Sequence, residues 1–143
     1  MAEIRNFGDF DSFKACRIFV KEIGFSLGEP RFDSNRILTE QMQRASISDL
    51  SNFAEGFERD GNAEFIQFLS ISKGSVGELR AQLTYALDQG FISDESFNEL
   101  DALGESSTRL FGGLMRYLAR AGRQGCKFAQ RKRARETIGN KGP

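Results

Sequence analysis

The chain has 143 residues, with 20 basic and 20 acidic side chains and 39% apolar content, which is enough for the core of a single soluble domain. It has no histidine and only two cysteines, Cys16 and Cys126, which excludes a disulfide framework and predicts free thiols, no metal site and no cofactor. Because it has neither a run of about eighteen apolar residues nor a secretory signal at its start, we expect a cytoplasmic protein without a membrane span.

Apolar residues at alternating steps of three and four predict a first helix over residues 13–27. Gly28 and Pro30 follow this helix and are typical of a helix end. A second helix is predicted over residues 33–59, with Asp33 as its N-cap.

The third helix shows the clearest apolar stripe and is expected to run from an N-cap at Asn62 to a stop at Gly90. The fourth is expected to begin at an N-cap formed by Ser93. Asp94 and Glu95 follow in its first turn, where acidic side chains favour the positive end of the helix dipole.

Short connections between long helices favour antiparallel neighbours. The predicted fold is therefore all-α, an antiparallel up-down-up-down four-helix bundle with a basic C-terminal tail. We expect the bundle to occupy residues 1–121 and the tail, predicted to be flexible, to occupy residues 122–143.

The second helix combines a polar face with a broad apolar surface. The polar face, which also includes Gln41, consists of Arg44, Ser48, Asn52, Glu55 and Arg59. The apolar residues spread over about 200°, whereas a surface helix usually shows an apolar stripe of about 100°. This excess predicts contacts with further copies of the chain and makes the polar face a candidate surface for oligomer or partner contacts. Alternatively, the extra apolar residues lie between neighbouring helices of the same chain.

Asp49 interrupts this apolar surface. An unpaired buried carboxylate is costly, so Asp49 is expected to be exposed, paired or close to a subunit rim.

A catalytic reading of the polar face would use Glu55 or Glu58 as an acid or base and Arg44 or Arg59 to hold an anion. The spacing supports only ion pairs along one helix, such as Glu55 with Arg59. No separate nucleophile and base accompany them, so the sequence predicts a protein that is not an enzyme.

Small residues recur in the third and fourth helices. The segment around Gly74 lacks the phosphate-loop pattern and lies inside a helical repeat. We therefore interpret these residues as places where a neighbouring helix comes close. They are Gly74, Ser75, Gly77, Gly112 and Gly113.

The net charge of the whole chain is zero, but acidic and basic residues are concentrated in different parts of the sequence. Residues 1–115 hold 11 Lys or Arg and 19 Asp or Glu, a net charge of −8, whereas residues 116–143 hold nine and one, a net charge of +8. Such a basic segment predicts salt-dependent, sequence-tolerant binding to RNA or DNA. The alternative is that the tail docks on the acidic body of a neighbouring subunit. The candidate nucleic-acid-binding residues are Arg116, Arg120, Arg123, Lys127, Arg131, Lys132, Arg133 and Arg135.

Residues 41–83 carry a family resemblance. They include Q-R-A-S-I-S-D-L-S-N-F-A-E-G, then E-F-I-Q-F-L-S-I-S-K-G-S and E-L-R-A-Q-L. This order and spacing resembles the four helix bundle protein family, also called the 23S ribosomal RNA intervening-sequence proteins. Three positions depart from the family pattern: Phe53 stands where Ile is usual, Asp49 where an apolar residue is usual, and Leu50 where Pro is common.

The resemblance implies a bundle that assembles into homopentamers, without a known enzymatic activity. More distantly, the chain is similar to accessory proteins of diversity-generating retroelements, which implies RNA and a reverse transcriptase as partners. We therefore expect a non-enzymatic ring-forming bundle that binds RNA or DNA through its basic segment. The alternative is a protein-interaction scaffold with no nucleic-acid role.

Overall fold

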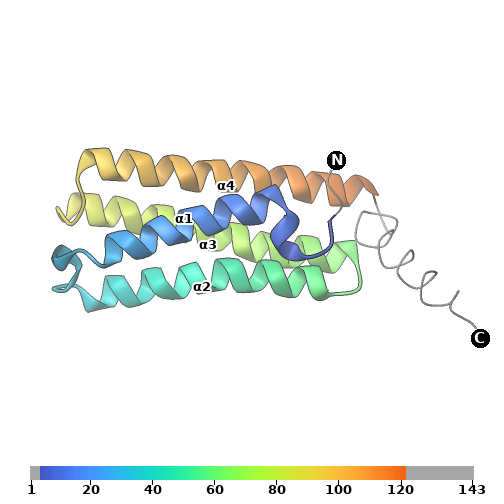
Figure 1. Cartoon of the computed structure of the whole chain (residues 1–143), viewed down its shortest axis with the longest axis horizontal. Helices are drawn as coiled ribbons and strands as arrows, with labels where there is room; N and C mark the ends of the chain where they lie inside the picture. Colours follow the sequence, from blue (N-terminus) through green and yellow to red (C-terminus); the bar gives the residue numbers. More distant parts are fainter. Residues whose placement is uncertain (1–3, 122–143) are drawn as a thin grey trace, which may run out of the picture.

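A computed structural model describes residues 4–121, and these residues form an all-α four-helix bundle, as predicted. Figure 1 shows the four helices lying side by side along one axis. Their bounds are α1 Asp11–Leu27, α2 Arg36–Glu58, α3 Asn62–Asp88 and α4 Asp94–Ala121, and short 3-10 turns, η1 (Phe7–Asp9) and η2 (Pro30–Phe32), precede α1 and α2. The predicted tail, residues 122–143, lies outside the described part of the chain.

Contacts between successive helices run in opposite order along the sequence. In α1 and α2, Phe13 packs on Phe53 with ring centroids 5.2 Å apart, and the later residue Cys16 contacts the earlier residue Asp49. This reversal is the pattern of antiparallel neighbours, and the short connections in Figure 1 agree with it. The same reversal is found between α2 and α3, in the pairs Ser48 with Ser75 and Gly56 with Phe68.

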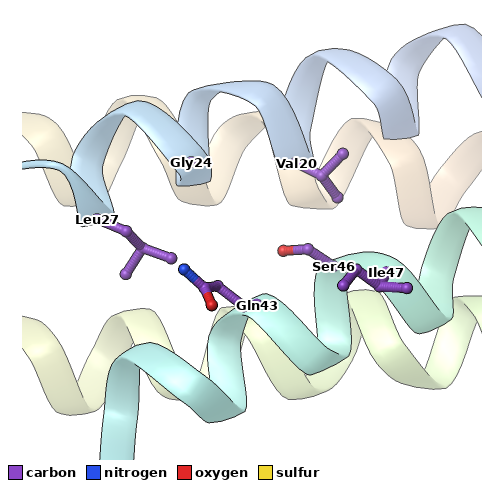
Figure 2. A pocket seen from close by; sticks show the side chains of 6 residues that line it. All are labelled: Val20, Gly24, Leu27, Gln43, Ser46 and Ile47. Carbon is purple, nitrogen blue, oxygen red and sulfur yellow. The ribbon is translucent and has the colours of Figure 1, made fainter. Parts of the chain in front are cut away.

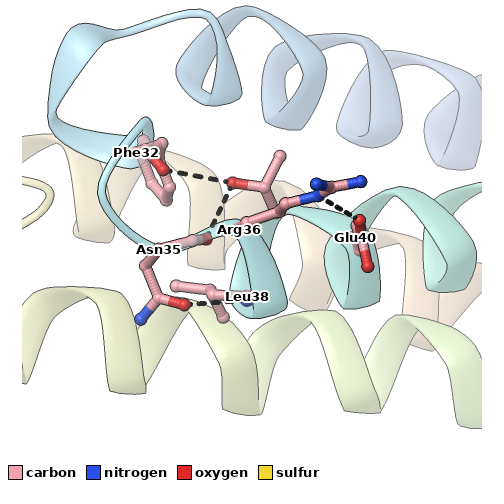
Figure 3. Close-up of polar contacts among 6 residues, drawn as sticks. Phe32, Asn35, Arg36, Leu38 and Glu40 are labelled. Carbon is pink, nitrogen blue, oxygen red and sulfur yellow. Dashed lines mark hydrogen bonds and ion pairs between the residues drawn. The ribbon is translucent and has the colours of Figure 1, made fainter.

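The start of α2 differs from the prediction. Its N-cap is Asn35, whose side-chain oxygen accepts a hydrogen bond from the Leu38 amide, whereas Asp33 ends the preceding turn η2 (Figure 3). Phe32 in that turn is buried and its ring lies 5.7 Å from that of Phe91. Burying this ring keeps the chain in a turn past Asp33, so the helix begins two residues later than the sequence suggested.

The third and fourth helices begin differently from each other. The N-cap of α3 is Gly61, which has no capping side chain, and the predicted cap Asn62 is instead the first helical residue and is buried. The predicted cap of α4 is confirmed, because the Ser93 hydroxyl accepts a hydrogen bond from the Ser96 amide at 3.1 Å. Gly90 ends α3 with a positive φ of 75°, a conformation that glycine adopts readily.

Phenylalanine rings fill the end of the core where α1 begins and α4 ends. Phe53 of α2 is fully buried at their centre. Its ring lies between 5.2 and 5.7 Å from four other rings, in tilted or edge-on arrangements, which are the favourable ones for aromatic pairs. These partners are Phe10, Phe13, Phe65 and Phe111. One side chain of α2 therefore joins α1, α3 and α4.

The close approach of α2 to α3 depends on Gly56. A Cβ atom at this position would lie 2.5 Å from Cβ of Phe68 and 3.1 Å from the ring of Phe65. Further along the same seam the Ser75 hydroxyl donates a hydrogen bond to the Ser48 hydroxyl at 3.0 Å. Small residues thus allow α2 and α3 to pack closely.

The other small residues of α3 and α4 do not follow the predicted pattern within this chain. A Cβ atom at Gly74 or Gly77 would meet nothing within 4 Å. At Gly112 and Gly113 it would meet only the guanidinium of Arg116. Of the five residues that we interpreted as sites of close helix packing, only Ser75 serves that purpose here, because the four glycines face away from neighbouring helices.

One ion pair joins α3 to α4. Arg80 donates to both carboxylate oxygens of Asp101, at 2.7 and 3.2 Å. This hydrogen bonding raises the pKa of Arg80, so its charge is secure. None of the helices within residues 4–121 is both long and apolar enough to cross a membrane.

Candidate nucleic-acid interface

The last turns of α4 form an exposed basic stripe. Arg109, Arg116 and Arg120 are all exposed, and their spacing of seven and four residues places them within about 40° of one another around the helix. No acidic residue occurs between residues 106 and 121. The stripe therefore presents positive charge to solvent, and the nearest acidic residue before it along α4 is the exposed Glu105, one turn before Arg109.

Glycines shape the surface of this stripe. The Arg116 guanidinium folds back along the helix, and its Nη1 lies 3.2 Å from where a Cβ atom of Gly112 would be. Tyr117 lies beside the stripe and is 47% exposed. An exposed ring next to arginines can stack on a base or on a sugar, and arginine can pair with phosphate.

The structure describes only part of the predicted basic segment. Arg116 and Arg120 lie on the exposed stripe, whereas the other predicted residues lie outside the described part of the chain. Those residues are Arg123, Lys127, Arg131, Lys132, Arg133 and Arg135. Sequence reasoning overlooked Arg109, although a signal for it exists, because residues 106–135 contain nine Lys or Arg and no Asp or Glu.

The polar face predicted on α2 is divided between a helix seam and open surface. Ser48 and Asn52 are half-buried, and the Asn52 amide donates to the backbone and side-chain oxygens of Ser48 at 2.8 and 3.0 Å. Arg59 pairs with Glu55 at 2.8 Å, and its guanidinium lies 5.1 Å from the centroid of the Phe68 ring. Most of these contacts are i,i+4 contacts along α2, and the contact of Arg59 with Phe68 joins the face to α3.

Arg44 belongs to the open part of this face. It is exposed and lines a shallow pocket on α2 together with Glu40, Gln43 and Ile47. Within residues 4–121, no cluster of three or more His, Cys, Asp or Glu side chains could hold a metal ion. Glu40, Gln43 and Arg44 offer ion pairing and hydrogen bonding on this surface.

A groove of about 210 Å³ lies between α1 and α2. Figure 2 shows Val20 and Leu27 on the α1 side of it and Gln43, Ser46 and Ile47 on the α2 side. Gly24 widens the α1 side, because a Cβ atom there would meet nothing within 4 Å. Ile47 is 66% exposed, so α2 presents apolar surface that the other residues of the described range 4–121 leave uncovered.

Comparison with known families confirms the family resemblance that the motifs of residues 41–83 indicated. A family model described as 23S rRNA-intervening sequence protein matches residues 9–113. The chain belongs to this family. No curated protein matched the sequence.

The family match spans α1, α2, α3 and most of α4, so the bundle itself is the family domain. Residues 114–143, which contain Arg116, Arg120 and all later basic residues, lie beyond it. The basic segment must therefore be interpreted from its own charge. Within the matched region, Gly56 of the N-F-A-E-G segment lies against Phe68 of α3, so this glycine has a packing explanation.

Proposed function

We propose that this chain is a non-enzymatic bundle that assembles into a ring and binds RNA or DNA electrostatically through its basic C-terminal segment. The observation that carries the proposal is the exposed stripe of Arg109, Arg116 and Arg120, which opens an acid-free run of 30 residues, 106–135. Contacts between such side chains and phosphates release counterions and favour binding of any sequence. Family membership supports an RNA-related setting without naming a ligand.

Removing residues 122–143 is expected to abolish most binding while preserving the bundle. The deletion takes away seven Lys or Arg and one Glu, whereas the described core lies within residues 4–121. If half of these charges contact phosphates at about 1 kcal/mol each, affinity falls by about a hundredfold or more. Gel mobility shifts with a structured RNA and a DNA duplex, at several salt concentrations, measure this loss, and circular dichroism checks the helices.

A paired substitution locates the interface on α4. Arg116→Gln with Arg120→Gln should reduce the salt slope of binding by about 2, with the same effect on every nucleic-acid sequence. Arg31→Gln with Arg36→Gln makes the same charge change at the opposite end of the bundle, where both side chains are exposed, and should leave the slope unchanged. If the full-length protein shifts neither RNA nor DNA at low salt, nucleic-acid binding is wrong.

For the ring, the supporting observation is the apolar groove between α1 and α2 with exposed Ile47 at its edge. We propose that this groove is a subunit contact. The number five, giving a homopentamer, comes from the family resemblance. A ring presents several basic segments to one polyanion, which raises the effective affinity of each weak contact.

Ile47→Glu is expected to dissociate the ring into single chains of 16.0 kDa, because it places a charge in an apolar contact. Ile18→Glu is the matched control, since Ile18 is 51% exposed on the side of α1 away from the groove. Sedimentation equilibrium of both variants and the unchanged protein measures the mass. A single-chain mass for the unchanged protein at micromolar concentration would refute assembly.

A protein-interaction scaffold is the alternative function, and the same open groove favours it. Its partners would include a reverse transcriptase, as the resemblance to retroelement accessory proteins implies. Treatment with nuclease separates the two functions. Association that survives nuclease and moderate salt favours the scaffold, and association lost under both treatments favours nucleic-acid binding.

A further inference from the structure

A layer of polar side chains crosses the apolar core near the middle of the bundle. Asp49 of α2 is completely buried, and its Oδ2 accepts a hydrogen bond from the Cys16 thiol of α1 at 2.7 Å. The Ser72 hydroxyl of α3 donates to the backbone carbonyl of Asp49. Three helices therefore contribute one polar side chain each to a single layer.

The fourth helix contributes Ser107 to this layer. A Cβ atom at Gly104 of α4 would lie 3.0 Å from the ring of Phe19 of α1, so these two residues face each other. The helices α1 and α4 run in opposite directions (Figure 1). The residue three positions before Phe19 in α1 therefore lies at the same level of the bundle as the residue three positions after Gly104 in α4. These steps lead to Cys16 and Ser107, which are both fully buried.

The Asp49 carboxyl has little to compensate a negative charge. Its Oδ1 has no hydrogen-bond partner, and the Ser107 hydroxyl has none either, within the described residues. Among the described residues, the hydrogen-bond partner of this carboxyl is the Cys16 thiol from α1, which is not a cation. The Ser72 hydroxyl from α3 binds the backbone carbonyl of Asp49, and Ser107 of α4 is a buried neutral hydroxyl at the same level of the core. Among the buried polar and charged side chains of residues 4–121, only Asp49 carries an acidic group stronger than a thiol.

An ionised carboxyl in such a place is costly, because burial removes its hydration without supplying an opposite charge. Burial accordingly raises the pKa of Asp49 to about 7, and the Cys16 hydrogen bond opposes this only in part. Burial and the neighbouring carboxylate raise the pKa of Cys16, so its thiol keeps its proton and remains a donor. A neutral Asp49 gains an O–H donor, and Ser107 offers a hydroxyl oxygen at the same level of the core.

We propose that Asp49 is a proton-dependent lock, in which the folded bundle holds a proton on this buried carboxyl and loses stability as the proton is withdrawn. The inference concerns the folded core and does not depend on the proposed nucleic-acid binding or on the ring. The stability of the folded bundle should therefore depend on pH near neutrality, although the described core contains no histidine.

The direction follows from proton linkage. The folded pKa of Asp49, about 7, lies above the ordinary pKa of 3.8 expected for the unfolded chain, so the folded state binds one more proton between these values. The stability that the proton on Asp49 contributes is fully present below about pH 4 and is lost as pH rises to about 7. One extra bound proton changes the folding equilibrium constant tenfold per pH unit, which gives about a thousandfold decrease across this window.

The test is urea unfolding of the full chain at a series of pH values from about 4 to about 8. Asp49→Asn cannot ionise, so the ratio of the two proteins' folding constants should fall by about a thousandfold over the window. Asp49→Leu provides a second neutral replacement if the asparagine variant fails to fold. Other carboxylates titrate in all three proteins, so their effects cancel in the ratios.

Ser72→Ala is the matched control, because Ser72 contacts the backbone of Asp49 rather than its carboxyl. It should lower stability equally at every pH and leave the slope of the curve unchanged. Carbon-13 NMR of the aspartate carboxyls in the unchanged protein should show one group titrating near neutrality. The lock is refuted if every aspartate titrates below about pH 5, or if the neutral variants keep the pH dependence of the unchanged protein.

Discussion

Replacing Phe53 with alanine is expected to reduce the free energy of unfolding by about 4 kcal/mol, as for other large-to-small changes of a buried ring. Phe53 is fully buried and contacts phenylalanine rings of α1, α3 and α4 as well as Phe10 before α1. Its loss leaves a cavity bordered by all four helices, and this cavity cannot close without moving a helix. Because domains are stable by only about 5–15 kcal/mol, the variant should be close to unfolding at physiological temperature.

The matched control is Phe25→Ala, which removes the same side chain from the surface. Phe25 is 66% exposed, and the Lys21 ammonium lies 5.9 Å from its ring centroid. Its loss should change stability by less than about 0.5 kcal/mol. Urea unfolding followed by circular dichroism measures both variants, and similar losses at the two positions would contradict the aromatic core described here.

The second large effect is expected from Gly56→Ala, which adds a single methyl group to the seam between α2 and α3. The new Cβ atom would lie 2.5 Å from Cβ of Phe68 and 3.1 Å from the ring of Phe65, so one helix must shift. Phe65 is completely buried and cannot move into solvent. We expect a loss of about 3 kcal/mol, because overpacking of a well-filled interface outweighs the better helix propensity of alanine.

Gly77→Ala makes the same change on the exposed side of α3, where the added Cβ atom would meet nothing within 4 Å. This variant should gain stability, by up to about 1 kcal/mol, since alanine favours the helix more than glycine. The two glycine variants should therefore shift the urea midpoint in opposite directions. A destabilised Gly77→Ala variant would instead indicate that another chain packs closely on α3.

The helices themselves could be predicted because apolar residues recur in each one at steps of three and four, the period of an α-helix. The cap at Ser93 was also predictable, since its partner Ser96 lies in the same helical turn. The predicted cap at Asn62 was wrong because the N-cap of α3 is Gly61, which has no capping side chain. The predicted cap at Asp33 was wrong because several polar residues near the start of α2 could serve. The choice among them depends on distant contacts, such as that between Phe32 and Phe91.

The candidate interface was predictable to the extent that it depends on charge. Arg116 and Arg120 belong to a basic run that is visible in the sequence, and Arg109 belongs to the same acid-free stretch. Their common exposure on one side of α4 required the helix to be placed against its neighbours. The face predicted on α2 shows the limit of helical-wheel reasoning, because Ser48 and Asn52 are polar yet half-buried beside α3.

The sequence by itself determined the four helices, the family and the separation of an acidic body from a basic end, because all three depend on the order and period of residues along the chain. The tertiary structure alone decided which residues lose contact with water. Asp49 interrupts an apolar surface in the sequence, but only the arrival of Cys16, 33 residues away, and of the facing helices makes it a buried acid. Desolvation depends on what surrounds a group from every side, and a one-dimensional pattern does not specify those neighbours.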